Sequence, residues 1–123
     1  MLLGTTFAWF TDSVCATGKA VYNNCVFDSW AICAISNVET YYNNCTIKEC
    51  LNTSGDFNSG NVYVSNSTVT KAEYSFRSAS SVMNFENCEI GELISWNANT
   101  VLTNCTVTTL DDTHMTTGTI TRN

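Results

Sequence analysis

The side chains best suited to acid–base chemistry in this 123-residue chain are Asp111, Asp112 and His114. Paired carboxyl groups and an imidazole are typical of sites that transfer protons. An inverting glycosidase, however, needs two carboxyl groups about 6.5–9.5 Å apart on one substrate-facing surface. Adjacent residues of an extended chain point to opposite sides, so the two carboxyl groups would diverge. A solvated turn at the end of a strand accounts for all three residues, and we predict no catalytic residue.

The acidic residues Glu49, Glu89 and Glu92 could form a calcium site, because Ca²⁺ prefers carboxylate oxygens. In the repeat described below, Lys71 falls between Glu49 and Glu92. An alternating ladder of charges is therefore the better interpretation. We predict neither a metal ion nor another cofactor.

Two further features could contact a ligand. Trp96 is a candidate for packing against a sugar ring in a carbohydrate-binding module. The segments Thr68–Thr70 and Thr106–Thr108 both read Thr-Val-Thr, a spacing suited to ice binding on a flat sheet. Glu89 and Gly91 interrupt that array on the intervening coil, which weakens the ice-binding interpretation.

All of these candidates must be positioned by one short pattern that recurs along the chain: apolar, any residue, Asn, Cys, any residue, apolar. It reads Tyr-Asn-Asn-Cys-Thr-Ile at residues 42–47, and copies begin at residues 22, 64, 85 and 102. The residues at the Cys position, called the anchors here, are Thr5, Cys25, Cys45, Ser67, Cys88 and Cys105, spaced 17 to 22 residues apart. A repeat of about 20 residues without proline predicts a solenoid in which each repeat is one coil.

We therefore predict an all-β fold: a right-handed, single-stranded parallel β-helix of about six coils, forming one domain over residues 1–123. Three columns stay apolar under this alignment and are expected to face inward. They are Phe7, Phe27, Ile47, Val69, Ile90 and Val107; Phe10, Trp30, Cys50, Ala72, Leu93 and Leu110; and Leu2, Tyr22, Tyr42, Val64, Phe85 and Leu102. Residues 1–10 show no helical periodicity, so no helical cap is expected over the first coil.

The residue before each anchor is Gly or Asn. These residues are Gly4, Asn24, Asn44, Asn66, Asn87 and Asn104, and Asn123 fits the same position one coil later. Gly and Asn tolerate the left-handed backbone conformation, so this position predicts a tight bend between two strands. Stacked Asn side chains can also hydrogen-bond along the column. We interpret the column as structural and not as a ligand site.

The seven cysteines are placed for packing and not for a disulfide framework. Four of them occupy the anchor position, and Ser67 fills the gap in that series. Side chains stacked in one column run parallel, which is poor geometry for a disulfide bond. We predict free, buried thiols.

Composition excludes two classes of partner. The net charge is -6 and the chain has five basic residues, which are scattered, so nucleic acid is not an expected partner. No apolar run approaches the roughly 18 residues of a membrane span, and the first residues do not form a signal peptide.

Asn-Cys followed by an alternating strand in successive coils resembles the right-handed parallel β-helices of the pectin-lyase-like superfamily. The resemblance covers essentially all 123 residues. That superfamily includes pectate lyases, polygalacturonases, phage tailspikes and bacterial adhesins, so the resemblance implies a fold and not one function. Polygalacturonase-like members carry Asp-Asp, Gly-His-Gly and Arg-x-Lys on successive coils. Here His114 lies between Thr113 and Met115, and Arg-x-Lys is missing from the sequence.

A solenoid that ends in open coils presents unpaired backbone and apolar columns, which favours edge-to-edge association. We predict a structural, self-associating β-solenoid without enzymatic activity, whose partners are other copies of the chain. It would stack end to end into a fibre or form part of a shaft, at an extracellular, cell-surface or virion location. The alternative is a fragment of a pectin-lyase-like carbohydrate-active enzyme or a carbohydrate-binding β-helix, with a polysaccharide as partner.

Overall fold

The protein is an all-β parallel solenoid in the computed structural model, which describes residues 2–3, 18–32, 38–52, 61–74, 82–95 and 99–123. These residues form two parallel sheets and no helix. Sheet A contains β1 (Leu2–Leu3), β2 (Gly18–Asn23), β4 (Val38–Asn43), β6 (Asn61–Ser65), β8 (Val82–Glu86), β10 (Asn99–Thr103) and β12 (Ile120–Arg122). Sheet B contains β3 (Val26–Ile32), β5 (Thr46–Asn52), β7 (Thr68–Tyr74), β9 (Glu89–Ser95) and β11 (Thr106–Asp111).

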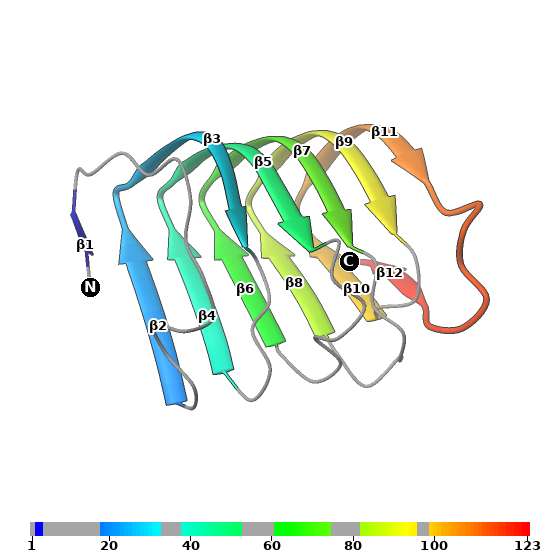
Figure 1. Ribbon diagram of the computed structural model, residues 1–123. Helices are drawn as coiled ribbons and strands as arrows, with labels where there is room; N and C mark the ends of the chain where they lie inside the picture. The colour runs from blue at the N-terminus through cyan, green and yellow to red at the C-terminus, as the bar shows by residue number, and fades with distance from the viewer. Residues whose placement is uncertain (1, 4–17, 33–37, 53–60, 75–81, 96–98) are drawn as a thin grey trace.

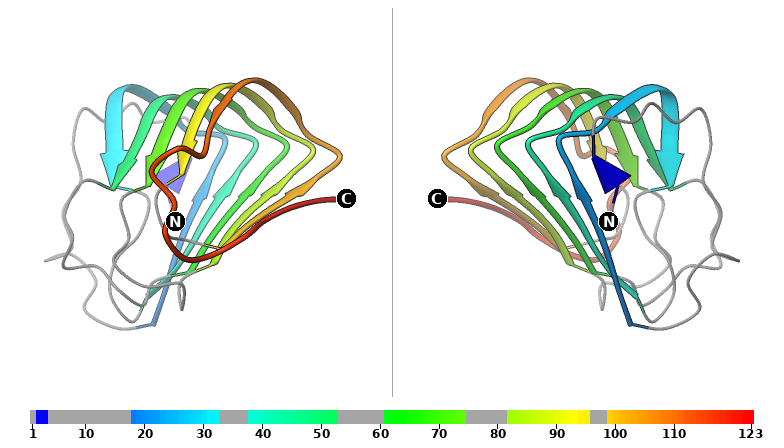
Figure 2. Two further views of the ribbon diagram at one scale, coloured as in Figure 1. Left: turned by 90° about the vertical axis from the view of Figure 1, so that its right-hand side faces the viewer. Right: turned by 90° about the vertical axis from the view of Figure 1, so that its left-hand side faces the viewer.

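From β2 to β12, consecutive strands alternate between the two sheets, so each coil in this range contributes one strand to each sheet (Figure 1). Seen along the stack, the sheets meet at a sharp corner (Figure 2). The predicted solenoid is confirmed. Within the described residues, sheet B has five strands and therefore about four turns from first to last, against the six coils predicted for the whole chain. Most of the expected first coil, including Thr5, Phe7 and Phe10, lies outside the described residues. The prediction that no helix caps this coil also concerns residues outside the described ranges.

The asparagine column forms the corner between the sheets, as predicted. Its five described members have φ angles of 51° to 56°, in the left-handed region. They are Asn24, Asn44, Asn66, Asn87 and Asn104. Asn tolerates this conformation better than other residues with a Cβ atom, so its recurrence sets the corner at the same place in every coil.

The inward columns stack in the predicted register over most of the chain. Tyr22, Tyr42, Val64, Phe85 and Leu102 are successive partners in sheet A, and each is at most 4% exposed. The Tyr22 and Tyr42 rings stack with centroids 5.1 Å apart. On the sheet B side Phe27, Ile47, Val69 and Ile90 are also buried. The two sets face each other and form one continuous core.

The register prediction was wrong for Trp30. Strand β3 shifts register between Phe27 and Trp30, so Trp30 pairs with Glu49 and Ala31 pairs with Cys50. The cause is one extra residue in β3 relative to β5, which is a β-bulge. Ala31, and not Trp30, therefore occupies the column of Cys50.

The prediction for Asn123 was also wrong by one position. Leu102 pairs with Arg122, and the Asn104 amide donates to the Asn123 carbonyl oxygen at 3.2 Å. Asn123 thus lies one residue before the bend position. The reason is that Ile120 packs against the core beside Thr100, which fixes the register of β12. Arg122 consequently occupies the apolar column of Leu102.

Candidate functional site

The anchor side chains donate hydrogen bonds across the corner. Each thiol or hydroxyl group donates to the carbonyl oxygen two residues earlier in the chain. The donor–acceptor distances are 3.3 Å for Cys25, 3.4 Å for Cys45, 2.7 Å for Ser67, 3.3 Å for Cys88 and 3.3 Å for Cys105. The anchor position therefore favours a short side chain that can donate a hydrogen bond. The sequence alone had suggested packing as the only reason for Cys and Ser at this position.

The four described anchor cysteines form no disulfide bond, and two of them have raised pKa values. Burial raises the pKa of the Cys45 thiol and raises that of Cys88 to about 11, because a thiolate is poorly solvated inside the stack. Both groups are protonated at neutral pH. A protonated, buried thiol is a poor nucleophile, which favours packing over chemistry at these two positions.

The corner asparagines form an exposed hydrogen-bonded ladder. The Asn44 side-chain amide donates to Asn24, Asn87 donates to Asn66 at 3.3 Å, and Asn104 donates to Asn87 at 2.7 Å. Beside it, Asn43 donates to Asn23 at 2.8 Å and Ser65 donates to Asn43 at 2.9 Å. The predicted asparagine ladder is confirmed, and three of the five corner side-chain amides donate to the preceding corner asparagine.

Asp111 holds a turn at the end of β11. Its carboxylate accepts hydrogen bonds from the Thr113 amide at 3.0 Å and from the Thr113 hydroxyl at 2.6 Å. The Thr113 hydroxyl, helped by the amide and by His114, lowers the pKa of Asp111. The His114 Nε2 atom lies 3.8 Å from the carboxylate, and the Asp112 carbonyl accepts from the Met115 amide at 3.1 Å. The geometry is that of a capped, exposed turn.

The charged residues on sheet B form a ladder. Lys71 pairs in register with Glu49 on one side and with Glu92 on the other, as predicted. The Lys71 ammonium group also lies 3.6 Å from the Glu73 carboxylate on the same strand. Over the described ranges of the chain, His, Cys, Asp and Glu form no group of three or more suited to a metal ion.

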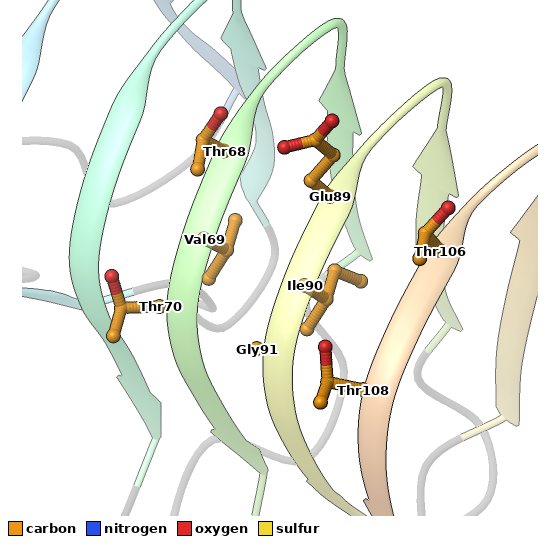
Figure 3. A pocket seen from close by; sticks show the side chains of 8 residues that line it. All are labelled: Thr68, Val69, Thr70, Glu89, Ile90, Gly91, Thr106 and Thr108. Atoms are coloured by element: carbon orange, nitrogen blue, oxygen red, sulfur yellow. The ribbon is translucent and has the colours of Figure 1, made fainter.

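A hollow of about 300 Å³ lies on the outer face of sheet B around Gly91 (Figure 3). A Cβ atom at residue 91 would lie 2.5 Å from the Thr70 carbonyl oxygen, so only glycine fits there. Thr70 and Thr108 flank the glycine on the two neighbouring strands (Figure 3). Glu89, Thr68 and Thr106 also line the hollow, together with the apolar Val69 and Ile90. The hollow offers hydroxyl groups and one carboxylate, and it breaks the flat array that ice binding would need.

The outer face of sheet A carries an aromatic pair that sequence reasoning missed. Tyr41 and Tyr63 are register partners, and their rings stack with centroids 4.6 Å apart. The Lys19 ammonium group lies 4.3 Å from the Tyr41 ring centroid, and the Tyr41 hydroxyl donates to Glu39 at 3.0 Å. The signal was present in the coil alignment, where the two tyrosines lie one residue before the apolar column. Trp96, the predicted aromatic candidate, lies outside the described residues.

Strand β11 lies at the edge of sheet B, and its outer side pairs with no other described strand. Val107 and Leu110 are half-buried, whereas their register partners Ile90 and Leu93 are 2% and 0% exposed. A hollow of about 360 Å³ opens at the adjoining corner, lined by Leu102, Asn104, Cys105, Thr106, Arg122 and Asn123. Among the described residues, sheet A continues past this level through β12, and β11 is the last strand of sheet B. An edge with unpaired backbone and half-covered apolar side chains is suited to adding another strand.

No known family model, curated protein or solved structure matches this chain. Within the part of the chain that the structure describes, no helix is long and apolar enough to cross a membrane.

Proposed function

We propose that this chain is a structural, self-associating β-solenoid whose copies join end to end through β11. The observation that carries the proposal is the change in burial between equivalent positions. Val69 and Ile90 are 0% and 2% exposed, but Val107, next in the same column, is only half-buried. Covering the last rung with another strand would restore the environment of the inner rungs.

The expected gain comes from apolar burial and from backbone pairing. Fully burying a Val or Leu side chain stabilises by about 1.5–3 kcal/mol, and Val107 and Leu110 have part of that burial still to gain. The Thr106 amide donates inward to the Cys88 carbonyl oxygen. Backbone groups alternate in direction along a strand, so those of Val107 point away from β9 and are available to a partner.

In this proposal the chain forms part of a fibre or shaft at a cell surface or virion. Its architecture is then related to that of the pectin-lyase-like β-helices. Low charge content and abundant Thr and Asn support a role as a stacking element. Stacked asparagine ladders also recur in fibrous β-assemblies. Extension into a fibre requires a second edge able to pair, in addition to β11.

Sedimentation velocity of the pure chain over a wide concentration range, with electron microscopy of the same samples, tests this proposal. Wild type should show reversible, concentration-dependent association. Val107→Lys should abolish it, because an inward charge would be buried by the partner. Thr68→Lys, on the exposed outer face of β7, is the matched control and should associate normally. A wild-type chain that stays monomeric at every concentration overturns the proposal.

Carbohydrate binding at the Gly91 hollow is the second candidate function. The hydroxyl groups of Thr70 and Thr108 and the carboxylate of Glu89 are groups that hydrogen-bond to sugar hydroxyls. A glycan array followed by calorimetry tests it. Thr70→Val with Thr108→Val should abolish any binding found, whereas Thr46→Val, also on the exposed face of sheet B, should preserve it.

A further inference from the structure

The outer face of sheet A holds two phenol rings from neighbouring coils in direct contact. Tyr41 on β4 and Tyr63 on β6 are register partners, and their rings stack with centroids 4.6 Å apart at an interplanar angle of 13°. Because the rings are nearly parallel, their equivalent ring carbons are separated by a similar distance. Both side chains are partly exposed, so a reagent in solution can reach them.

The inner face of the same sheet carries a second tyrosine pair with similar geometry. Tyr22 and Tyr42 stack with centroids 5.1 Å apart at an interplanar angle of 16°. These two residues are only 4% and 1% exposed. The two pairs therefore have similar ring geometry but differ in their access to solvent, and the outer pair is the one open to chemistry.

The surroundings of Tyr41 favour a reaction with Tyr63. The Tyr41 hydroxyl group donates to the Glu39 carboxylate at 3.0 Å. A phenol that loses an electron becomes a strong acid, and a carboxylate in this position is placed to accept its proton. The Lys19 ammonium group lies 4.3 Å from the Tyr41 ring centroid. Lys19 belongs to β2 and Tyr63 to β6, on opposite sides of β4, so Tyr63 is the aromatic neighbour within reach of this ring.

We propose that Tyr41 and Tyr63 are an oxidative crosslinking site at which the two rings join as dityrosine. The co-substrate is a one-electron oxidant, of the class formed by a peroxidase with hydrogen peroxide. Each phenol loses one electron and its phenolic proton, and the two radicals couple through a new carbon–carbon bond between Cε atoms. Each bonded carbon then loses its hydrogen as a proton while the neighbouring oxygen regains one. The two electrons and two protons removed in total convert one hydrogen peroxide into two water molecules.

The crosslink would join β4 to β6 covalently, between residues 22 positions apart in the sequence. Partly exposed side chains change rotamer within picoseconds to nanoseconds, which allows the stacked rings to tilt until the Cε atoms meet. Like a disulfide bond, the crosslink restricts the unfolded chain, so the crosslinked protein should unfold at a higher urea concentration. It lies within one chain and does not rest on the proposed self-association.

Oxidation of the full chain at low protein concentration tests this site. One sample receives a peroxidase with limiting hydrogen peroxide. A parallel sample receives a photoactivated ruthenium trisbipyridine complex with persulfate, which needs no enzyme to reach the rings. We expect dityrosine fluorescence and a crosslinked peptide pair, found by mass spectrometry, that contains Tyr41 and Tyr63 and has lost two hydrogen atoms. Tyr41→Phe and Tyr63→Phe should each lose this product, whereas Tyr42→Phe, at the buried pair, should retain it. Circular dichroism verifies that the variants fold.

The role of Glu39 has its own comparison. Glu39→Gln should slow formation of the crosslink, and Glu39→Asp should retain more of the rate because it keeps a carboxylate. Glu86→Gln removes an equal charge from an exposed position on the same sheet and should react as fast as wild type. Equal rates for Glu39→Gln and wild type would overturn the role of Glu39 as proton acceptor.

The site itself is overturned by any of three results. These are no dityrosine with either oxidant, a crosslink that maps to another pair of tyrosines, and dityrosine found only between chains. Each result would leave the proposed end-to-end association untouched, because that association is measured without oxidant. A wild-type chain that is monomeric at every concentration would overturn self-association and leave the crosslinking site standing.

Discussion

Strands β9 and β11 occupy successive rungs of the same sheet, yet their inward residues differ in burial. Ile90 and Leu93 on β9 are 2% and 0% exposed, whereas Val107 and Leu110 on β11 are half-buried. The residue types are equivalent, and the register between the strands is continuous. What differs is that β9 has a neighbour on both sides. Burial in this solenoid is therefore conferred by adjacent rungs, as expected for a stack with nearest-neighbour contacts.

The corner of the stack shows the same contrast in hydrogen bonding. The Asn87 side chain donates to Asn66 and accepts from Asn104, so it is linked on both sides. Asn104 donates to Asn87 and is the last corner asparagine among the described residues. The inner and last rungs thus provide matched pairs of positions, with the same residue and conformation but different neighbours.

The largest expected difference is between Leu93→Ala and Leu110→Ala. Leu93 is 0% exposed, and truncating a buried leucine costs about 2–5 kcal/mol because it leaves a cavity. Leu110 is half-buried, so the same truncation should cost less than half as much in the monomer. Urea unfolding at low protein concentration measures both. Equal losses would contradict the dependence of burial on neighbouring rungs.

Substitutions at the corner should give the next largest effect. Asn87→Ala replaces a residue that tolerates the left-handed conformation with one that does not, at a cost of about 1–2 kcal/mol, and it removes two ladder hydrogen bonds. Asn104→Ala has the same backbone cost but removes one ladder bond. Asn87→Gly retains the left-handed backbone conformation and removes only the two ladder hydrogen bonds. It therefore separates the backbone cost from the cost of the lost hydrogen bonds. Chemical denaturation should rank Asn87→Ala as the most destabilising of the three.

The anchor thiols provide a pH-dependent comparison. The pKa of Cys88 is raised to about 11 from 9.0, so folding favours its protonated form. Stability from this group is complete below pH 9 and is lost as pH rises toward about 11. Cys88→Ser should reduce this loss, measured as the change in melting temperature between pH 8 and 10.5. Cys105→Ser is the control on the half-buried last rung, and an identical reduction there would contradict the assignment to Cys88.

Much of the fold could be predicted because each coil repeats the same local requirement. The bend needs a left-handed residue, and Asn satisfies it at every described corner. The inward columns need apolar residues, and the repeat aligned Tyr42, Val64 and Phe85 correctly. These requirements depend on residue type and spacing alone, so the sequence is sufficient to identify them.

The errors arose where pairing between coils, and not residue type, decides the position. Trp30 is aromatic and suited an apolar column, but the bulge in β3 moved it by one residue. Arg122 was not expected in the apolar column; the packing of Ile120 beside Thr100 sets the register of β12 and places Arg122 there. The Tyr41–Tyr63 stack joins residues 22 positions apart, in a coil longer than its neighbours. The hydrogen bonds of the anchors follow from the corner geometry, which the sequence alone does not reveal.

The smallest expected effect concerns the turn that follows β11. Hydrogen bonds from Thr113 lower the pKa of Asp111 below its ordinary value of 3.8, so folding favours the ionised form. The contribution is present above pH 3.8 and is lost as pH falls through the lower folded pKa. Asp111→Asn should remove this acid dependence of the melting temperature between about pH 2 and 5, whereas Asp112→Asn removes an equal charge and should retain it. The Asp111→Asn substitution should also increase the rate of amide hydrogen exchange at Thr113. It should not increase the rate at Glu89 on β9, because the turn lies beyond the last strand of sheet B. A similar increase on β9 would contradict the view that each rung depends chiefly on its immediate neighbours.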